Sequence, residues 1–401
     1  MPDPEPPATP DPAGDVARDD ALRTTRQLVD GVLGPLKQTF VGKDIAIDLL
    51  GVGLIARENV FLFGPPGTAK SALVNKLAHR IDGRVFDYLL TRFTEPNEVF
   101  GPFDIRQLRE GELVTNTEGM LPEADLVFLD ELLNANSAIL NALLLALNER
   151  VFRRGRETRD LPTLMVVAAG NSLPEDEALA ALFDRFLIRT LVDNVPGDDL
   201  SRVLEAGWAL EQQRSGSGGN EAETQRVSVD DLRVAQHAVA RVDVSSVRDV
   251  FGELLLAIRR AGLSVSDRRA VRYQRLLAAS AMLCGRMTAQ ASDLWTLRYT
   301  WDRIEQRSVL TTLVDEAIER GTQPDDTAAH PQATAASAPD PESLARDLDT
   351  LASEIAAASG GQQLALRDRV AAIAGRVQWI GAGEQRTALD AQLDRLWKSL
   401  A

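Results

Sequence analysis

The feature that most constrains the fold of this chain is a strand–turn–helix pattern between residues 60 and 74. An apolar run, Val60–Phe63, leads into a turn bearing glycine and proline, and Lys70 and Ser71 open the helical segment that follows. Backbone N–H groups of such a turn and the positive end of the helix face a phosphate. A lysine here reaches the β- and γ-phosphates, and a serine hydroxyl holds Mg²⁺. The pattern predicts a site for ATP and Mg²⁺, in preference to a plain Gly-Pro turn between a core strand and a helix.

One residue departs from the usual pattern, because Ala69 stands where a second glycine normally precedes the lysine. A methyl group is tolerated if this residue is already helical, so we expect the departure to be minor. The residues expected to surround the phosphates are Gly64, Pro65, Pro66, Gly67, Thr68, Ala69, Lys70, Ser71 and Ala72.

A second apolar run ends in two acids further along the chain. Leu126–Asp130 has the composition of a buried parallel strand, and Glu131 follows it directly. We expect Asp130 to hold Mg²⁺ through water and Glu131 to polarise the attacking water, since strand ends of this kind meet the nucleotide. Alone, the run would fit a strand end with a solvated acid pair equally well. Its position after the phosphate-binding turn favours the functional interpretation.

Two further polar residues follow apolar segments in the same region. Asn171 comes after the apolar run 164–169, where its amide can hydrogen-bond the water or the γ-phosphate. Arg185 lies between apolar neighbours, a rigid mounting of the kind that an arginine finger offered to a neighbouring subunit needs. A surface arginine paired with Asp184 explains the local sequence equally well.

The order of these motifs resembles that of AAA+ ATPases, and particular strings resemble the MoxR family and its RavA-like group. The resemblance covers roughly residues 25–310, and alanine before the lysine also suits that group. The strings are LTRFTEPNEVFGP at 90–102, GMLPEA at 119–124, LNERVF at 147–152 and SDRR at 266–269.

The resemblance implies roles for individual residues. Lys70, Ser71, Asp130 and Glu131 match the family's P-loop and its Mg²⁺ and water pair, known as the Walker A and Walker B motifs. Asn171 matches the sensor asparagine, Arg185 the finger that acts in trans, and Arg268 a second sensor arginine that the lid domain brings back over the nucleotide. Arg189 or Arg269 could take over one of the arginine roles, and Gly42, after Val41, matches the place where backbone touches the adenine.

For the whole protein, the resemblance implies a Mg²⁺-dependent ATPase that assembles into a homo-oligomeric ring, a hexamer. It implies chaperone-like remodelling or maturation of a protein client, helped by a von Willebrand factor A domain protein. A nucleotide-gated scaffold with incidental turnover is the alternative from a non-enzyme class. A nucleic-acid motor is a weaker one, supported by the arginine cluster between Arg150 and Arg159, which also fits a solvated hairpin balanced by acids.

Composition bears on partners and location. The chain has 44 basic and 59 acidic residues and a net charge of −15, which disfavours a general grip on nucleic-acid phosphate. No apolar run approaches the roughly 18–20 residues that span a bilayer, and no secretory signal is visible. The single cysteine, Cys284, cannot form an internal disulfide, and three scattered histidines do not suggest a zinc site. These features predict a cytoplasmic protein without a membrane span.

Apolar periodicity divides the chain into a predicted α/β domain with a parallel sheet, an all-α lid domain and a C-terminal helical bundle. Trp295, Tyr299 and Trp301 are expected to pack in the core, and the insertion at 93–118 to sense or move a partner, a plain surface loop being an equal contender. The predicted divisions are a disordered acidic tail at 1–20, the nucleotide-binding domain at 21–195, the lid at 196–320, a linker at 321–341 and the bundle at 342–401.

Overall fold

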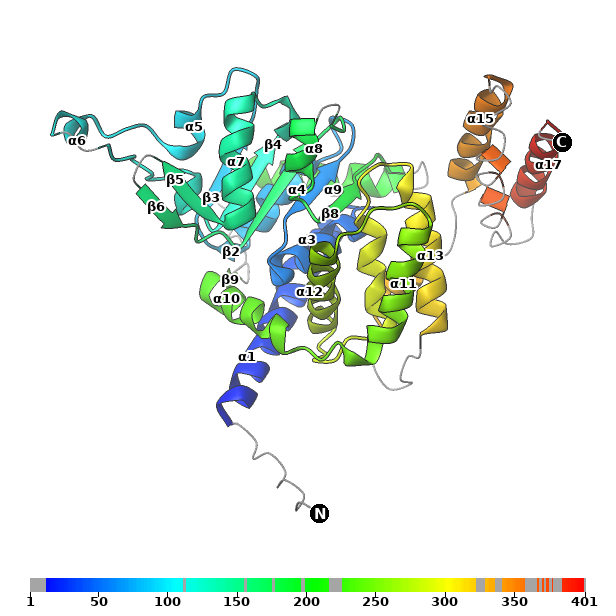
Figure 1. Ribbon diagram of the computed structural model, residues 1–401, viewed down its shortest axis with the longest axis horizontal. Coiled ribbons are helices and arrows are strands. Elements are labelled where there is room, and N and C mark those ends of the chain that lie inside the picture. The colour runs from blue at the N-terminus through cyan, green and yellow to red at the C-terminus, as the bar shows by residue number, and fades with distance from the viewer. Residues whose placement is uncertain are drawn as a thin grey trace, which may run out of the picture. The chain divides into compact units, whose positions relative to one another are not determined.

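The computed structural model describes residues 12–110, 113–154, 157–174, 177–195, 199–215, 226–321, 329–335, 341–357, 366–367, 370, 373–374, 377 and 384–399 (Figure 1). The chain divides into two compact units, Met1–Ala329 and His330–Ala401. The first unit holds a parallel sheet, its flanking helices and an all-α region, and the second is a helical bundle. This is the α/β architecture with helical additions that the sequence pattern predicts.

Five strands form the central sheet in the order β3-β4-β7-β1-β8, with parallel pairing throughout. Apolar runs form these strands because both faces of a parallel sheet are buried, and β7 is buried along its whole length. Because the strands are parallel, their carboxyl ends all lie at one edge of the sheet and their amino ends at the other, and we call these the carboxyl edge and the amino edge. The strands are β1 (Val60–Phe63), β3 (Val85–Leu89), β4 (Leu126–Asp130), β7 (Met165–Gly170) and β8 (Ile188–Leu191).

Helices pack against this sheet, and two smaller strand pairs lie beside it. Helix α3 contacts β1 and β8, and α4 contacts β4 and β7. A short hairpin, β5 with β6, and a two-residue pairing of β2 with β9 lie outside the central sheet. The elements up to residue 195 are α1 (Pro12–Leu28), a π-helical turn (Val29–Leu33), α2 (Gly34–Thr39), α3 (Asp44–Ala56), α4 (Lys70–His79), β2 (Ile81–Asp82), α5 (Pro96–Phe100), α6 (Ile105–Arg109), η2 (Leu121–Glu123), η3 (Leu132–Asn134), α7 (Ser137–Glu149), β5 (Val151–Arg154), β6 (Glu157–Asp160) and α8 (Glu177–Phe183).

The N-terminal segment differs from the prediction of a disordered tail over residues 1–20. Residues 1–11 lie outside the described part of the chain, but α1 begins at Pro12 and continues to Leu28. Proline is compatible with the first turn of a helix because its missing N–H has no intrahelical acceptor there. The C-terminal half of α1 buries Ala21 and Leu28 and packs against α10, which anchors the more exposed first turns.

The all-α region follows β8. Its elements are α9 (Leu200–Ser215), β9 (Val227–Ser228), α10 (Val229–Ala238), η5 (Val239–Arg241), η6 (Ser245–Val247), α11 (Arg248–Arg260), α12 (Asp267–Leu283), η7 (Ala291–Tyr299) and α13 (Gln306–Arg320). Trp295 and Trp301 are fully buried, so their predicted role in core packing is confirmed.

A charged network lies inside this region. Asp293, which is fully buried, accepts hydrogen bonds from both guanidinium NH groups of Arg286 at 2.9 Å. Its carboxylate also accepts from Ser280 Oγ at 2.7 Å and from the backbone N–H of Gln290 at 2.7 Å. These bonds satisfy the buried charge, because an unpaired carboxylate here would lose its hydration without compensation.

The second unit has its own apolar core. Its described helices are α14 (Pro331–Ala335), α15 (Pro341–Ala357) and α17 (Glu384–Ser399). The three predicted stripes meet in one buried cluster, with Ile355 packed against it. Leu400, the last residue of the third stripe, lies outside the described residues. The cluster comprises Leu344, Leu348, Leu351, Leu366, Val370, Ile373, Val377, Leu389, Leu393 and Leu396.

A search of the described helices finds none with the length and apolar character that crossing a bilayer requires.

Removing the buried acid tests the network. We expect Asp293→Ala to lower the free energy of unfolding by about 3–5 kcal/mol, because it leaves the Arg286 guanidinium buried and without its counter-charge. Urea denaturation followed by far-ultraviolet circular dichroism measures the change. As a control, Glu316→Ala breaks an ion pair whose two side chains are 54% and 60% exposed, and it should cost less than about 1 kcal/mol. Equal effects of the two substitutions would contradict the network's role.

Candidate functional site

The carboxyl edge brings three predicted segments together. The turn after β1, the acids at the end of β4 and Asn171 after β7 all lie there, because β1 and β4 both pair with β7 in parallel. The backbone N–H of Gly64 donates to Gly170 O at 3.1 Å, which fixes the start of the turn beside the end of β7. The sheet topology thus assembles residues that are far apart in the sequence.

The turn between β1 and α4 is held by its own polar groups. Lys70 Nζ donates to Gly64 O at 2.8 Å and to Pro65 O at 2.9 Å, and Thr68 Oγ1 donates to Pro65 O at 2.9 Å. Burial lowers the pKa of Lys70, and the nearby Asp130 and Glu131 carboxylates partly offset that effect. The lysine is therefore a buried cation at the first turn of a helix, where backbone N–H groups also lack intrahelical partners.

Two glycines of this turn are required for different reasons. A Cβ at Gly64 would lie 2.1 Å from the carbonyl oxygen of Val192, the residue after β8, so no larger residue fits. Gly67 has φ +84° and open space around its missing Cβ, so the backbone conformation is what favours glycine there. The open space beside Gly67 is what a cradle for phosphate needs.

Contrary to the prediction, Ala69 does not have a right-handed helical conformation. It is the N-cap of α4 with φ 65° and ψ 22°, in the left-handed region that costs an L-residue about 1–2 kcal/mol. The expectation that its methyl group is accommodated by right-handed helical geometry is therefore wrong. The turn keeps the conformation that a glycine would adopt, and the neighbouring contacts of Lys70 and Thr68 hold it.

Ser71 and Asp130 provide the oxygen pair expected of a Mg²⁺ site. Ser71 Oγ donates to Asp130 Oδ2 at 2.6 Å, from the first turn of α4 to the end of β4. A hydroxyl and a carboxylate are hard oxygen ligands that Mg²⁺ prefers, and its other positions are normally filled by water and phosphate oxygens. Within the described residues no cluster of three or more Asp, Glu, His or Cys side chains could hold a metal by itself. The residues present fit a metal that arrives with a nucleotide.

Glu131 stands beside this pair in an unusual conformation. Its φ of 52° and ψ of 40° are left-handed, and its backbone N–H donates to Asp130 Oδ1 at 3.0 Å. Burial and the Asp130 charge raise the pKa of Glu131, and Lys70 partly offsets them. A carboxylate whose pKa moves toward neutrality is better matched to accept a proton from water.

Asn171 and Gly42 lie where the sequence pattern predicts. Asn171 is exposed at the end of β7, between the strands that carry Gly64 and Asp130. Gly42 has φ 71°, and a Cβ there would lie 2.8 Å from the Val195 side chain. Lys43 Nζ also donates to Asp193 O, so this loop packs on the segment after β8. Both residues are accessible from the carboxyl edge, and their contacts with a nucleotide stay predictions.

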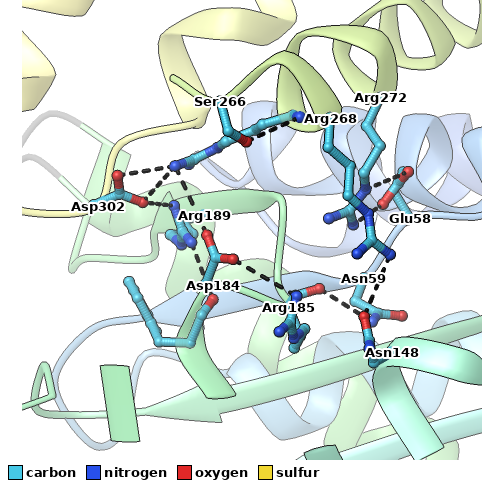
Figure 2. Close-up of polar contacts among 12 residues, drawn as sticks. Glu58, Asn59, Asn148, Asp184, Arg185, Arg189, Ser266, Arg268, Arg272 and Asp302 are labelled. Carbon is cyan, nitrogen blue, oxygen red and sulfur yellow. Dashed lines mark hydrogen bonds and ion pairs between the residues drawn. The ribbon is translucent and has the colours of Figure 1, made fainter. Parts of the chain in front are cut away.

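Arg185 lies at the opposite, amino edge of the sheet (Figure 2). Asn59, the residue before β1, donates its side-chain amide to Arg185 O at 3.2 Å. The four residues of β1 alone separate this edge from Gly64 by about 13 Å. Arg185 pairs with Asp184 at 3.8 Å, as the surface interpretation predicts, but its Nε is buried and has no hydrogen-bond partner in the described part of the chain. Arg185 thus lies at the edge of the sheet opposite the turn after β1.

Arg189 and Arg269 are committed to the fold. The Arg189 side chain is fully buried and donates to Asp302 at 2.8 Å (Figure 2). It also donates to Trp301 O at 2.5 Å and to Phe183 O at 3.0 Å. Burial and repulsion from Arg269 lower the pKa of Arg189 to about 10, so it stays charged at neutral pH. Arg269 donates to both carboxylate oxygens of Asp302 at 2.8 and 2.9 Å. Neither guanidinium is free to approach a ligand in this conformation.

Arg268 does not lie over its own chain's nucleotide site. Its guanidinium donates to Asn148 Oδ1 at 3.5 Å, near the end of α7 (Figure 2). Arg150, directly after α7, donates to Arg57 O shortly before β1, so the end of α7 lies at the amino edge. The prediction that the lid brings Arg268 back over the nucleotide in cis is wrong for this structure. The reason is that α12 packs against α3, so the start of α12 reaches the amino edge and not the carboxyl edge.

The sequence interpretation missed Asp302, which joins Arg189 and Arg269. No local pattern marks this acid, because its partners lie 113 and 33 residues away along the chain. A second missed pair, Asn134 and Asn136, lies three and five residues after Glu131. The pattern of two asparagines separated by one residue at a helix start could have identified them, since asparagine is a preferred N-cap.

The basic cluster is largely engaged within the chain. Arg150 donates to Thr163 O and Arg57 O, and Arg159 donates to Thr117 Oγ1. Arg154 donates to Gly101 O and stacks on the Phe103 ring at 4.0 Å, which joins the β5–β6 hairpin to the insertion. Arg156 lies outside the described residues. These contacts favour the solvated hairpin over a nucleic-acid groove.

Comparison with known proteins identifies the family. Residues 26–234 match the MoxR domain of the MoxR–vWA–β-propeller ternary systems, and residues 246–314 match an AAA lid domain. Two uncharacterised proteins of Methanocaldococcus jannaschii are 32% and 31% identical over 276 and 282 residues, which is 68% and 70% of this chain and 71% of each relative. The chaperone MoxR1 of Mycobacterium tuberculosis is 29% identical over 158 residues, 38% of this chain and 41% of that protein.

A solved structure shares the fold. The crystal structure of a candidate ATPase from Cytophaga hutchinsonii superposes with a TM-score of 0.60 at 19% identity, covering 78% of this chain and 98% of that chain. At this identity the likeness concerns the fold alone.

The strain at Ala69 gives a testable prediction. Ala69→Gly should raise the free energy of unfolding by about 0.5–1 kcal/mol, because relief of the left-handed strain exceeds the added freedom of the unfolded chain. Ala72→Gly is the matched control: Ala72 is exposed inside right-handed α4, so glycine there should cost about 1 kcal/mol. Thermal denaturation of both variants measures the two changes. A loss of stability in Ala69→Gly would contradict the strain.

Proposed function

We propose that this chain, which belongs to the MoxR family of AAA+ proteins, hydrolyses ATP to ADP and phosphate with Mg²⁺. The observation that carries this proposal is the convergence of Lys70, Ser71, Asp130 and Glu131 at the carboxyl edge, with Ser71 Oγ 2.6 Å from Asp130. The family match over residues 26–234 supports the same activity. Placement within the RavA-like group stays a prediction.

Each group at the edge has a task in this reaction. The backbone N–H groups of residues 67–71 and the Lys70 ammonium bind the phosphates. Ser71 and Asp130 hold Mg²⁺, which supplies positive charge to the transferring phosphoryl group. Glu131 accepts the proton of the attacking water, and Asn171 hydrogen-bonds that water or the γ-phosphate. Gly42 backbone lies against the adenine.

We propose that the site is completed by a neighbouring copy in a ring, a hexamer. Arg185 and Arg268 both lie at the amino edge, away from their own chain's phosphate turn. A head-to-tail arrangement that sets the amino edge of one subunit against the carboxyl edge of the next would bring both arginines to the γ-phosphate in trans. The 28% exposure of the Arg185 side chain and its loose ion pair with Asp184 at 3.8 Å support this arrangement, because its guanidinium can still meet a phosphate.

We propose a chaperone-like role in which the ring remodels or matures a protein client with a von Willebrand factor A domain partner. The support is the matched family's description, which joins MoxR to vWA and β-propeller proteins, and the likeness to a protein described as a chaperone. The insertion at 93–118, which exposes Phe93 and Ile105, is a candidate contact for the client. A cytoplasmic location is part of this proposal.

The role of Glu131 can be tested by an isosteric change. Glu131→Gln should bind ATP with wild-type affinity and hydrolyse it about 10²–10⁴-fold more slowly, because the amide cannot accept the proton. In the wild-type chain kcat should fall as pH drops through the pKa of Glu131, and this limb should lie above the ordinary glutamate range because that pKa is raised. Steady-state turnover across pH, with nucleotide binding measured alongside, gives both results. Near-normal hydrolysis by Glu131→Gln would refute the assignment.

Mixing experiments test the trans arginine. Arg185→Ala chains should still bind nucleotide but hydrolyse it at least about tenfold more slowly. Adding Glu131→Gln chains should restore part of the activity, since a mixed ring contains interfaces with an intact glutamate in one subunit and an intact arginine in the next. The readout is turnover at several mixing ratios, with mixed rings verified by mass. No recovery at any ratio would count against action in trans.

A further inference from the structure

Glu131 is held by a residue three positions further along the chain. Asn134 Nδ2 donates to Glu131 Oε2 at 3.2 Å, and the Asn134 backbone N–H donates to Glu131 O at 2.9 Å. Both bonds close the single turn η3 (Leu132–Asn134). Because Asn134 engages Oε2, it sets the rotation of the carboxylate and leaves Oε1 to accept a proton from water.

The same turn is fastened at its far end. Asn136 is the N-cap of α7, and its Oδ1 accepts from Ala138 N and Ile139 N, both at 3.1 Å. Its Nδ2 faces the other way and donates to Thr94 O at 2.7 Å and to Arg92 O at 3.3 Å. One side chain thus performs two separable tasks, capping a helix with its oxygen and tethering the insertion with its nitrogen.

The tethered segment 91–94 is itself rigid. Thr94 is 3% exposed, its Oγ1 accepts from Thr91 N at 2.9 Å, and its backbone N–H donates to Thr91 O at 3.1 Å. The chain just before it is joined to β4, because Leu90 N donates to Asp130 O at 2.9 Å. Residues 130–136 are therefore fixed to one turn at both ends, through Asp130 and through Asn136.

This double fixation accounts for the backbone of Glu131. A non-glycine residue at φ 52° costs about 1–2 kcal/mol and persists only where its surroundings hold it. The bond from Leu90 N to Asp130 O holds the chain before Glu131, and the bond from Asn136 Nδ2 to Thr94 O holds the chain after it.

We propose that Asn134 and Asn136 are positioning residues for hydrolysis: Asn134 orients the Glu131 carboxylate, and Asn136 holds its backbone by tethering α7 to the segment 91–94. The proposal rests on the proposed role of Glu131 as the proton acceptor. The contacts described above join the two asparagines to Glu131, α7 and the segment 91–94, so we expect their loss to change turnover and to leave nucleotide affinity intact.

The test uses the full chain and steady-state ATP hydrolysis. Asn134→Ala should lower kcat about tenfold with KM for ATP unchanged, as expected for loss of one hydrogen bond to a charged group. It should also move the acid limb of kcat to higher pH, because a donor to the ionised carboxylate is lost and the pKa of Glu131 rises. Structural damage alone would not move that limb.

Asn136→Ser separates the bond of Asn136 to Thr94 O from its role as the N-cap of α7. Serine is an equally good N-cap, so the variant keeps α7 and wild-type stability while losing the donor to Thr94 O. We expect kcat to fall severalfold, and the effect to be less than additive with Asn134→Ala because both act on the same carboxylate. Leu89→Ala is the control: it removes a 58% exposed apolar side chain just before the same turn without removing a hydrogen bond, and basal kcat should not change.

Three results bear on the proposal. It is overturned if Asn134→Ala hydrolyses ATP at or above the wild-type rate, or if Asn136→Ser, folded and stable, matches wild type. It is supported if both variants lower kcat without changing KM and Leu89→Ala does neither. Glu131→Gln, measured in parallel, distinguishes failure of the proposed function from failure of this inference. Normal turnover by Glu131→Gln refutes the proposed role of Glu131. An inactive Glu131→Gln beside an unaffected Asn134→Ala refutes the positioning role alone.

Discussion

Parallel pairing of β1 with β7 on one side and β8 on the other is the constraint on which the rest of this structure depends. It puts the end of β1, and with it Gly64, beside Gly170 at the carboxyl edge. The same pairing puts the beginning of β1 beside the turn that carries Arg185. A short strand thus separates the proposed phosphate-binding turn from Arg185, which lies at the opposite edge of the same sheet. Sheet geometry, and not any single side chain, makes the proposed active site depend on a second copy.

The carboxyl edge could be predicted from the sequence because each of its parts is a local pattern. An apolar run ending in a polar residue specifies both a buried strand and the edge at which its last side chain appears, which is why Ser71 and Asp130 meet as expected. The amino edge could not be predicted in this way. Whether Arg268 approaches one edge or the other depends on how α12 packs against α3, and no periodicity in either helix encodes that choice.

Backbone strain marks the second limit of prediction. Ala69 and Glu131 are both left-handed non-glycine residues, and they flank the Ser71–Asp130 pair in the sequence of the two motifs. The residue types do not predict this left-handed backbone, because alanine and glutamate favour right-handed helices. In both cases the conformation is enforced by neighbours: Lys70 and Thr68 close the turn around Ala69, and the segment from Asp130 to Asn136 is fixed at both ends around Glu131. Strain at these positions is consistent with function, since relaxed geometry would aim the groups elsewhere.

At the amino edge, two arginines are held in close ion pairs, while Arg185 beside them has a looser one. Asp302 satisfies Arg189 and Arg269 together, and the fully buried Arg189 ties β8 to the chain after η7. That cluster fixes the neighbouring Asp184 and Arg185 on a stiff mounting, so Arg185 loses little conformational freedom on meeting a ligand. An arginine neutralised by a close bidentate acid would gain little from a phosphate. Arg185 instead pairs with Asp184 at 3.8 Å, and its side chain is 28% exposed, so a phosphate brought by the proposed neighbouring subunit would bind it more closely than Asp184 does.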